Sequence, residues 1–442
     1  MENMLKVGYG RVEITPEGPI NLGGYGNDAV RISKEVRDPL YATCIAFTDG
    51  GGNTALLFTT DALQTYEALA TPVREAIAQE QGIPFENVIV AATHSHSTPA
   101  GFLTNPAVMA YREKYAEGLK NAARKAMADR TEAAIYVGNT YTENMNWIRH
   151  YKMADGTTAG SNFGNWSSGI VGHTSQPDTN LQVIKFLRPG NKDVVLTNFQ
   201  AHPCHTGGID KYVISADYIG DMRKFVEEKT GARFAHFQGA AGNHGGVSVD
   251  KKEVRTADAA EYGQLLGDYV LKALRCTRSV VGDMTVKTLR RDMDLPYDHT
   301  DGHLVDKAQE IQKVWKETYD RPMCNKLARE IGQNSIYAVG HIIARAGRPE
   351  RGEMPIYALR VGPIGFACAP YEMFGANGMF IKEWSPYATT FVVTHCNGSK
   401  SYLASKLAFH HGCYEVDSRW YPEGTAELLA DNFVEMLKEL KK

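Results

Sequence analysis

The sequence has no excess of charge of either sign and few cysteines. Its 48 Lys and Arg residues nearly balance 51 Asp and Glu residues, giving a formal net charge of −3. Without a basic surplus, no electrostatic argument favours a nucleic-acid partner. The seven cysteines are scattered and form no Cys-x-x-Cys pair, which argues against a zinc ribbon or a disulfide framework. This cysteine usage fits a reducing compartment, so we expect a cytoplasmic protein.

Long apolar runs are also absent from the sequence. No stretch approaches the roughly 20 apolar residues that a membrane helix needs, and residues 1–8 lack the basic and apolar segments of a signal peptide. We therefore expect no stable association with a membrane. No internal repeat, low-complexity tract or clear interdomain linker divides the chain, so we predict a single domain over residues 1–442. The sequence leaves open whether this domain forms a homo-oligomer.

Strand-like and helix-like segments alternate along the chain, a pattern typical of an α/β fold. We expect strands at residues 54–61, 88–92, 135–137, 181–187, 194–201, 233–238 and 364–370, and helices at residues 69–81, 107–130, 219–230 and 426–440. Residues 156–172 are rich in Gly, Ser, Thr and Asn, which predicts a long surface loop. Residues 297–351 are poor in hydrophobic residues and include a charged, amphipathic helix at 304–319. We interpret this stretch as a solvated helical insertion rather than a partner-binding arm.

Two histidines follow the buried strand predicted at residues 88–92. His94 and His96 lie one residue apart in a polar segment. On an extended backbone, alternate side chains point the same way, so both imidazoles would face one site. Neutral imidazole is the commonest protein metal ligand, which makes a catalytic metal the first hypothesis. Two histidines in a hydrogen-bonded loop are the alternative.

Two further predicted strands end at residues with metal-binding side chains. The strand at 194–201 runs into His202, and the strand at 364–370 leads to Glu372. Loops at the strand ends of α/β sheets are common places for ligands. Two imidazoles and a carboxylate, with a position open to water, form a recurrent catalytic zinc set. These residues are far apart in the chain, and each segment taken singly would more often have a structural role.

Short motifs occur along the chain at residues 7–11, 21–26, 93–101, 201–203, 215–217, 370–372, 402, 414–417 and 424–427. Taken together, these motifs resemble those of the neutral/alkaline, non-lysosomal ceramidase family over nearly the whole chain. Their order along the chain makes the resemblance specific. It implies a ceramidase catalytic-domain-like fold, with twisted mixed β-sheets flanked by helices.

The resemblance also implies a zinc-dependent amide hydrolase. By motif, the zinc ligands would be His94, His202, Glu372 and Tyr402. Bound zinc lowers the pKa of water to about 7 and polarises the scissile carbonyl. A phenol with an ordinary pKa near 10 is a poor ligand until it is ionised. The alternative role of Tyr402 is therefore a hydrogen bond beside the metal.

Several neighbours are implied to take part in catalysis. His96 would carry a proton from the attacking water to the leaving amine, or would fix a ligand by a hydrogen bond. Asp61 or Asp217 would orient such an imidazole. Arg149 would stabilise an oxyanion or bind a substrate carboxylate, or would be a plain surface arginine. The family likeness further suggests that Tyr414 touches the substrate, although most tyrosines pack with a satisfied hydroxyl.

One loop departs from the family pattern. Family members carry Gly-Asp-Val-Ser-Pro-Asn, whereas this chain has Gly-Ala-Ala-Gly-Asn-His at residues 239–244, with Gly242 at the serine position. Without that hydroxyl, we expect water to attack directly, with Asn243 and His244 as hydrogen-bond donors to the oxyanion or substrate. The alternative is a glycine-rich turn without chemistry.

The second departure is at the two ends of the sequence. The chain has neither the C-terminal β-sandwich-like domain nor the signal peptide of many ceramidases, so we expect a small, soluble amide as substrate rather than a membrane lipid. The sequence therefore predicts a zinc-dependent hydrolase that cleaves a small N-acyl compound, with zinc and no organic cofactor. The alternatives are a zinc esterase or lactonase, a ceramide-type lipid amidase, and a non-catalytic small-molecule binding protein.

Overall fold

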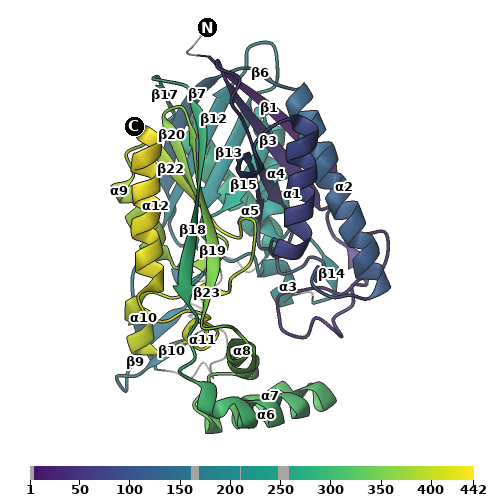
Figure 1. Cartoon of the computed structure of the whole chain (residues 1–442), viewed down its shortest axis with the longest axis vertical. Coiled ribbons are helices and arrows are strands. Elements are labelled where there is room, and N and C mark those ends of the chain that lie inside the picture. Colours follow the sequence, from purple (N-terminus) through teal and green to yellow (C-terminus); the bar gives the residue numbers. More distant parts are fainter. Residues whose placement is uncertain (1–3, 161–168, 210, 247–257) are drawn as a thin grey trace.

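Three large β-sheets share one apolar core in the computed structural model, which describes residues 4–160, 169–209, 211–246 and 258–442. Helices cover the outer face of each sheet, and in Figure 1 α1 and α2 lie on the opposite side of the molecule from α9 and α12. Parallel and antiparallel pairs occur together in every one of these sheets. The predicted fold class, mixed β-sheets flanked by helices, is confirmed.

The first sheet carries the strand that leads to His94. Its order is β5-β4-β3-β1-β6, with strands β1 (Leu5–Glu13), β3 (Tyr41–Asp49), β4 (Thr54–Thr60), β5 (Val88–Ala92) and β6 (Thr131–Glu132), and with helices α1 (Glu67–Gln81) and α2 (Pro106–Ala128) on its outer face. Along β3, Phe47 points into the shared core while Cys44 points toward the helices. Because both faces of the sheet are buried, the sequences of its central strands are nearly continuous runs of apolar residues.

The second sheet carries the strand that leads to His202. Its order is β15-β13-β12-β7-β17, with strands β7 (Ala134–Tyr141), β12 (Asn180–Leu187), β13 (Val194–Phe199), β15 (Arg233–Gln238) and β17 (Arg278–Val280), and with helices α4 (Tyr218–Thr230) and α5 (Ala259–Arg275). Leu196 faces the shared core, and its neighbour Val195 packs among the residues of α4 and α5.

The third sheet has the order β18-β19-β20-β22 and lies close to Glu372 in the sequence. Its elements are β18 (Val286–Pro296), β19 (Arg351–Val361), β20 (Ile364–Cys368) and β22 (Thr389–Val393), covered by α9 (Gly375–Trp384) and α12 (Thr425–Lys441). Phe366 faces the shared core, whereas Ala367 packs against the helices.

A group of three helices separates β18 from β19 and lies at the end of this long strand pair (Figure 1). The helices are α6 (Val305–Thr318), α7 (Arg321–Glu330) and α8 (Ile336–Ala346). Trp315, Cys324 and Ile342 belong to a small apolar core of their own. A core of this size needs few apolar residues, which explains the low hydrophobicity of the predicted insertion.

Short elements connect the sheets around the strand ends. They are β2 (Glu35–Val36), β8 (Trp147–Ile148), β9 (His150–Met153), β10 (Thr158–Gly160), β11 (Ile170–His173), β14 (Val213–Ile214), β16 (His244–Gly245), β21 (Glu372–Met373), β23 (Tyr402–Leu403), α3 (His205–Ile209), α10 (Lys406–His411) and α11 (Tyr414–Asp417). The loop predicted at 156–172 is wrong at both ends, because β10 and β11 pair with β9 there, and residues 161–168 lie outside the described part. Among the described residues, no helix is both long and apolar enough to cross a bilayer.

Helix α2 packs directly on strand β1 at two glycines of the first motif. A Cβ atom at Gly8 would overlap the carbonyl oxygen of Ala126, and one at Gly10 would overlap that of Ala122. Both clashes would be with backbone atoms of α2, which cannot move away by a change of rotamer as a side chain can. The glycines of the motif at residues 7–11 therefore allow the close contact between β1 and α2.

We predict that Gly10→Ala lowers the free energy of unfolding by about 2 kcal/mol or more, because the added methyl forces α2 off the sheet. Denaturant unfolding followed by circular dichroism measures this. Gly18→Ala is the matched control, since a Cβ at Gly18 meets nothing within 4 Å, and its effect should stay below about 1 kcal/mol. Similar losses for both variants would contradict the packing argument.

Candidate metal centre and cavity

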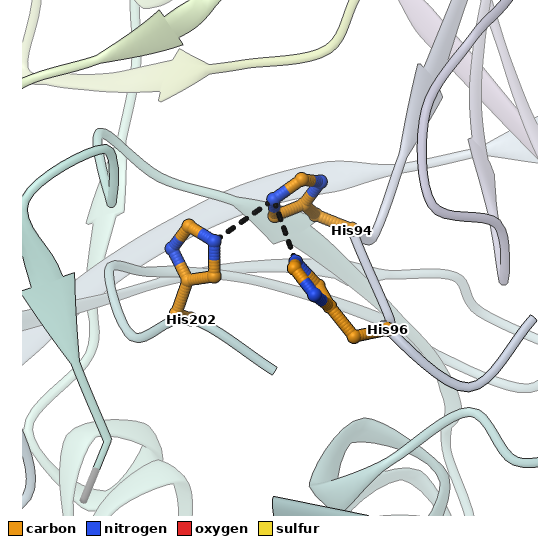
Figure 2. A group of neighbouring side chains, drawn as sticks. All are labelled: His94, His96 and His202. Atoms are coloured by element: carbon orange, nitrogen blue, oxygen red, sulfur yellow. Dashed lines mark hydrogen bonds between the residues drawn. The ribbon is translucent and has the colours of Figure 1, made fainter. Parts of the chain in front are cut away.

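Strand ends from two sheets bring His94 and His202 together. His94 follows β5 and His202 follows β13, and their Nε2 atoms are 3.0 Å apart. His96 Nε2 is 3.2 Å from His94 Nε2, so the three imidazoles form one cluster (Figure 2). All three residues are buried.

The convergence of His94 and His96 has a different cause from the one predicted. The strand ends at Ala92, and His94 has a left-handed backbone with φ of 69°. The expectation of an extended backbone is therefore wrong. This left-handed backbone at His94, rather than strand alternation, accompanies the convergence of the two imidazoles. A left-handed conformation costs a residue with a Cβ roughly 1–2 kcal/mol.

Glu372 and Tyr402 reach the cluster as a pair. Strands β21 and β23 are parallel, with Glu372 directly opposite Tyr402. Glu372 Oε2 lies 3.4 Å from His94 Nε2 and 3.6 Å from His202 Nε2. A two-residue strand pair thus holds together two positions that are 30 residues apart in the sequence.

The spacing of these atoms fits a tetrahedral cation site. Two ligands at zinc–nitrogen distance are about 3.4 Å apart at the tetrahedral angle, and the three distances among His94, His202 and Glu372 run from 3.0 to 3.6 Å. Within the described residues, the buried Oε2 atom of Glu372 accepts no hydrogen bond. A carboxylate oxygen left in this way is suited to a cation.

Backbone carbonyls fix the tautomers of two of the imidazoles. His94 Nδ1 lies 2.6 Å from the carbonyl oxygen of Leu63, and His202 Nδ1 lies 3.1 Å from that of Ala241. Each Nδ1–H donates to its carbonyl, so each Nε2 keeps a free lone pair for a metal. His96 Nδ1 has no hydrogen-bond partner among the described residues. This difference favours His94 and His202 as ligands and His96 as their neighbour.

Burial disfavours the charged forms of His96 and His202. It lowers the pKa of both imidazoles well below the usual value, and the positive charge of neighbouring Arg149 acts in the same direction. Neutral imidazole is the form that binds metals.

A buried ion pair between Arg149 and Glu415 contacts the Tyr402 hydroxyl. Arg149 Nη2 donates to the Tyr402 hydroxyl at 3.2 Å and to the Gly242 carbonyl at 2.7 Å, while Arg149 Nε donates to Glu415 Oε1 at 2.7 Å. The other Glu415 oxygen lies 2.8 Å from His150 Nε2. Arg149 is thus not a surface residue.

Burial and the neighbouring charges shift the pKa values of Glu415 and Tyr402 in opposite directions. Burial by itself would raise the pKa of Glu415, but the charges of Arg149 and His150 lower it to about 2. Burial raises the pKa of Tyr402 well above 10, and the positive charge of Arg149 acts against this rise.

A cavity of about 530 Å³ opens at the cluster. His94, His96, Glu372, Tyr402 and Tyr414 line it, together with the aromatic residues Tyr66, Phe102 and Trp420, the charged residues Glu67 and Arg112, and His341 of the helical insertion. The rings of Tyr414 and Tyr402 meet edge to face at 5.8 Å. This volume is typical of small-molecule sites.

Asn243 and His244 are not among the residues that line this cavity. Asn243 Oδ1 accepts from the backbone N–H of Gly375 at 3.0 Å, and His244 Nε2 accepts from that of Asp178 at 2.9 Å. Burial lowers the pKa of His244 to about 4. Both side chains hold loops together in this structure, and their proposed catalytic role stays a prediction.

The two aspartates considered as partners of His96 bind elsewhere. Asp61 accepts two hydrogen bonds from Arg223 Nη2, at 2.6 and 2.8 Å. Asp217 caps α4 and lies 3.4 Å from His205. The expectation that either one orients His96 is wrong.

Sequence reasoning missed two residues of the site, His395 and Glu415. His395 follows β22 just as His94 follows β5 and His202 follows β13, so the same strand-end criterion would have found it. Its ring stacks on that of His94 with centroids 3.9 Å apart. Glu415 lies next to Tyr414 in the motif at residues 414–417. Nothing in the sequence indicates that it pairs with Arg149.

The fold and the site together define a mixed α/β protein with a buried histidine–carboxylate cluster suited to a divalent cation. Residues 5–248 match the family described as neutral/alkaline non-lysosomal ceramidase, N-terminal. The neutral ceramidases of Drosophila pseudoobscura pseudoobscura and Drosophila melanogaster are each 26% identical over 152 residues, which cover 32% of this chain and 21% of theirs. The matched part thus spans about a fifth of these relatives.

Two solved structures have the same fold. The crystal structure of neutral ceramidase from Pseudomonas aeruginosa superposes with a TM-score of 0.75 at 17% identity, covering 100% of this chain and 75% of that one. A ceramidase complexed with C2 gives 0.74 at 18% identity, covering 99% and 75%. The chain belongs to the neutral/alkaline non-lysosomal ceramidase family.

We predict that Glu415→Gln destabilises the protein, because it leaves Arg149 without its buried counter-charge. The pKa of Glu415 falls from 4.5 to about 2 on folding, a difference that corresponds to about 3 kcal/mol at neutral pH. This stability is present above pH 4.5 and is lost as the pH falls toward 2. Urea unfolding of the metal-free protein should therefore show the wild type and the variant converging in acid.

Glu330→Gln, at the exposed end of α7, is the control for this comparison. Its effect should stay within about 0.5 kcal/mol at every pH. A gap between wild type and Glu415→Gln that does not shrink in acid would show that the carboxylate charge is not the cause.

Proposed function

We propose that the protein is a zinc-dependent hydrolase that cleaves the amide bond of a small N-acyl compound. The observation that carries the proposal is the meeting of His94, His202 and Glu372 at zinc-ligand spacing beside a cavity of about 530 Å³. Tyr402, which lies opposite Glu372, would be the fourth ligand. The names of the relatives, neutral ceramidases, agree with an amide substrate.

Zinc held by His94, His202 and Glu372 would supply a water molecule of lowered pKa and would polarise the substrate carbonyl. His96 lines the cavity in neutral form next to His94. It accepts the proton of the attacking water and returns it to the leaving nitrogen as the carbon–nitrogen bond breaks. The products are a carboxylic acid and an amine, and His96 ends in its starting state.

The remaining side chains position the reacting groups. Arg149 is held by Glu415 and by the Gly242 carbonyl, and it fixes the Tyr402 hydroxyl by a hydrogen bond of 3.2 Å. A nearby positive charge also favours the ionised form of Tyr402 as a ligand. Tyr414 lines the cavity above Tyr402, where its ring contacts the bound substrate.

The cavity lining accommodates both halves of an N-acyl amine. Tyr66, Phe102 and Trp420 offer apolar surface to an acyl chain, while Glu67 and Arg112 offer polar groups to the amine half. An ester would pass through the same kind of tetrahedral intermediate. A ceramide-type lipid amide is the second candidate, because the relatives are named ceramidases. The cytoplasmic location, the single domain and any homo-oligomer stay predictions.

We predict about one zinc per chain by elemental analysis. His94→Ala and His202→Ala should lose metal and activity together, because each removes a ligand. His96→Ala should keep the metal and lose about 10²–10⁴-fold in turnover, because it removes only the proton carrier. Metal content and steady-state kinetics are measured on the same preparations.

Full activity in either ligand variant would refute the metal assignment. Loss of zinc from His96→Ala would make His96 a ligand, and the proton carrier would then be another group. Circular dichroism of each variant checks that the fold is retained.

A panel of matched substrates tests the reaction class. We expect the zinc-loaded protein to hydrolyse short N-acyl amines and N-acyl amino acids faster than long-chain N-acylsphingosines, because the cavity has the volume of a small-molecule site. Product amine is measured for amides and product alcohol for the matched esters. Preference for the esters would indicate an esterase, preference for N-acylsphingosines a lipid amidase, and binding without cleavage a binding protein.

A further inference from the structure

The lining of the cavity includes an arginine without a counter-charge. Besides the histidines, the charged residues of the lining are Glu67, Arg112 and Glu372. Lys400 Nζ lies 2.7 Å from Glu67 Oε2 and balances its charge. Glu372 faces His94 Nε2 at 3.4 Å within the histidine–carboxylate cluster. Arg112 forms no ion pair with a carboxylate of the described residues, so its charge is left for a ligand of the cavity.

Arg112 is fixed to the segment that carries two histidines of the cluster. It is a half-buried residue of α2, and its Nε donates to the carbonyl oxygen of Gly101 at 2.7 Å. Gly101 ends the motif at residues 93–101, which contains His94 and His96. This bond therefore holds the guanidinium in a defined place relative to the cluster.

The two outer nitrogens of Arg112 have no strong acceptor within the described part of the chain. Nη1 donates to the sulfur of Met109 at 3.4 Å, and thioether sulfur is a weak acceptor. Nη2 forms no hydrogen bond with any described residue. A guanidinium is permanently charged, and two of its nitrogens match the two oxygens of a carboxylate. Because Arg112 lines the cavity, these nitrogens are available to a carboxylate bound there.

Apolar surface adjoins the anchor of Arg112. A Cβ at Gly101 would lie 2.6 Å from Cε2 of Tyr66, so the Tyr66 ring packs directly on this backbone. The ring of Phe102 lies next to it, with centroids 5.8 Å apart. Both aromatic residues line the cavity. A ligand that has an anionic group and an apolar side chain would use the arginine and the rings together.

We propose that the amide substrate carries a carboxylate group that Arg112 binds, as in an N-acyl amino acid. This inference rests on the proposed function, because it names the substrate class of that amide hydrolase. Water adds to the acyl carbon and the carbon–nitrogen bond breaks, so the products are a carboxylic acid and a free amino acid. Arg112 determines substrate specificity and takes no part in proton transfer.

Ligand binding to the metal-free protein tests the proposal apart from catalysis. Without the metal, the carboxylate of a ligand cannot bind to zinc instead of Arg112. Isothermal titration calorimetry compares N-butanoyl-leucine with N-butanoyl-leucinol, which has a hydroxymethyl group in place of the carboxylate. We expect the wild type to bind the acid about 10-fold or more tightly than the alcohol, because hydrogen bonds between two charged groups are the stronger ones. Arg112→Gln should lose this preference.

Lys114→Gln is the matched control, since it removes a positive charge from the same helix. Lys114 pairs with the exposed Glu17 at 3.2 Å and is not among the residues that line the cavity. Its variant should keep the preference for the acid. Arg112→Lys keeps the charge but loses the planar fork, so it should bind the acid more weakly than wild type does. Thermal unfolding checks the fold of each variant, and Arg112→Lys serves where Arg112→Gln is unstable.

Turnover by the zinc-loaded protein is the second measurement. We expect kcat/KM for N-butanoyl-leucine to exceed that for N-butanoyl-leucinol by about 10-fold or more, and Arg112→Gln to remove the difference. Monoamides of succinic acid place the carboxylate on the acyl half. A preference for these compounds that disappears in Arg112→Gln would keep Arg112 as the carboxylate site and assign the carboxylate to the acyl half.

The remaining results separate this inference from the proposed function. Equal binding of acid and alcohol by the wild type would overturn the inference, as would a preference that persists in Arg112→Gln. Cleavage of acid and alcohol at equal rates would also overturn it and would leave the amide hydrolase standing. If the protein cleaves no amide but binds the acid through Arg112, the carboxylate site is right and the proposed function is wrong. If it neither binds nor cleaves these compounds, both are wrong.

Discussion

The histidine–carboxylate cluster depends on the packing of three sheets around one apolar core. Residues such as Phe47, Leu196 and Phe366 face this core from the three different sheets. Because the sheets are held there by buried apolar surface, the ends of β5, β13 and β22 are brought close together. Without this packing His94, His202 and Glu372 would not meet, since His94 and His202 are more than 100 residues apart in the sequence and His202 and Glu372 more than 150.

Some buried polar groups of the cluster lack hydrogen-bond partners in the described part of the chain, whereas those of the neighbouring ion pair have them. The imidazoles and the Glu372 carboxylate are removed from water, and an unsatisfied buried acceptor costs roughly 1–3 kcal/mol. A cation would satisfy these groups at once, so metal binding and folding stability are coupled. The neighbouring ion pair of Arg149 and Glu415 needs no metal, because each charge meets hydrogen-bonding partners within the protein. The site therefore has an outer layer whose polar groups are hydrogen-bonded and a centre where buried polar atoms lack partners among the described residues.

The sequence predicts local structure well where the physics is local. The strand at residues 233–238 and the helix at 107–130 follow from apolar runs and helical spacing, and both are present within two residues. The failures come from long-range contacts. No local pattern shows that Asp61 pairs with Arg223, or that the backbone turns to a positive φ at His94. The strand-end pattern was informative, but it was applied to His94 and His202 and not to His395.

Gly242 lies too close to the backbone of β21 to carry a side chain. A Cβ at Gly242 would lie 2.8 Å from the carbonyl oxygen of Glu372 and 2.9 Å from that of Met373. The Gly242 N–H also donates to the Met373 carbonyl at 2.8 Å. The loop therefore packs its backbone directly on β21, where any side chain would push Glu372 away from His94. Because this close packing leaves no room for a side chain at residue 242, it supports the proposal that water, rather than a hydroxyl group of this loop, attacks the substrate.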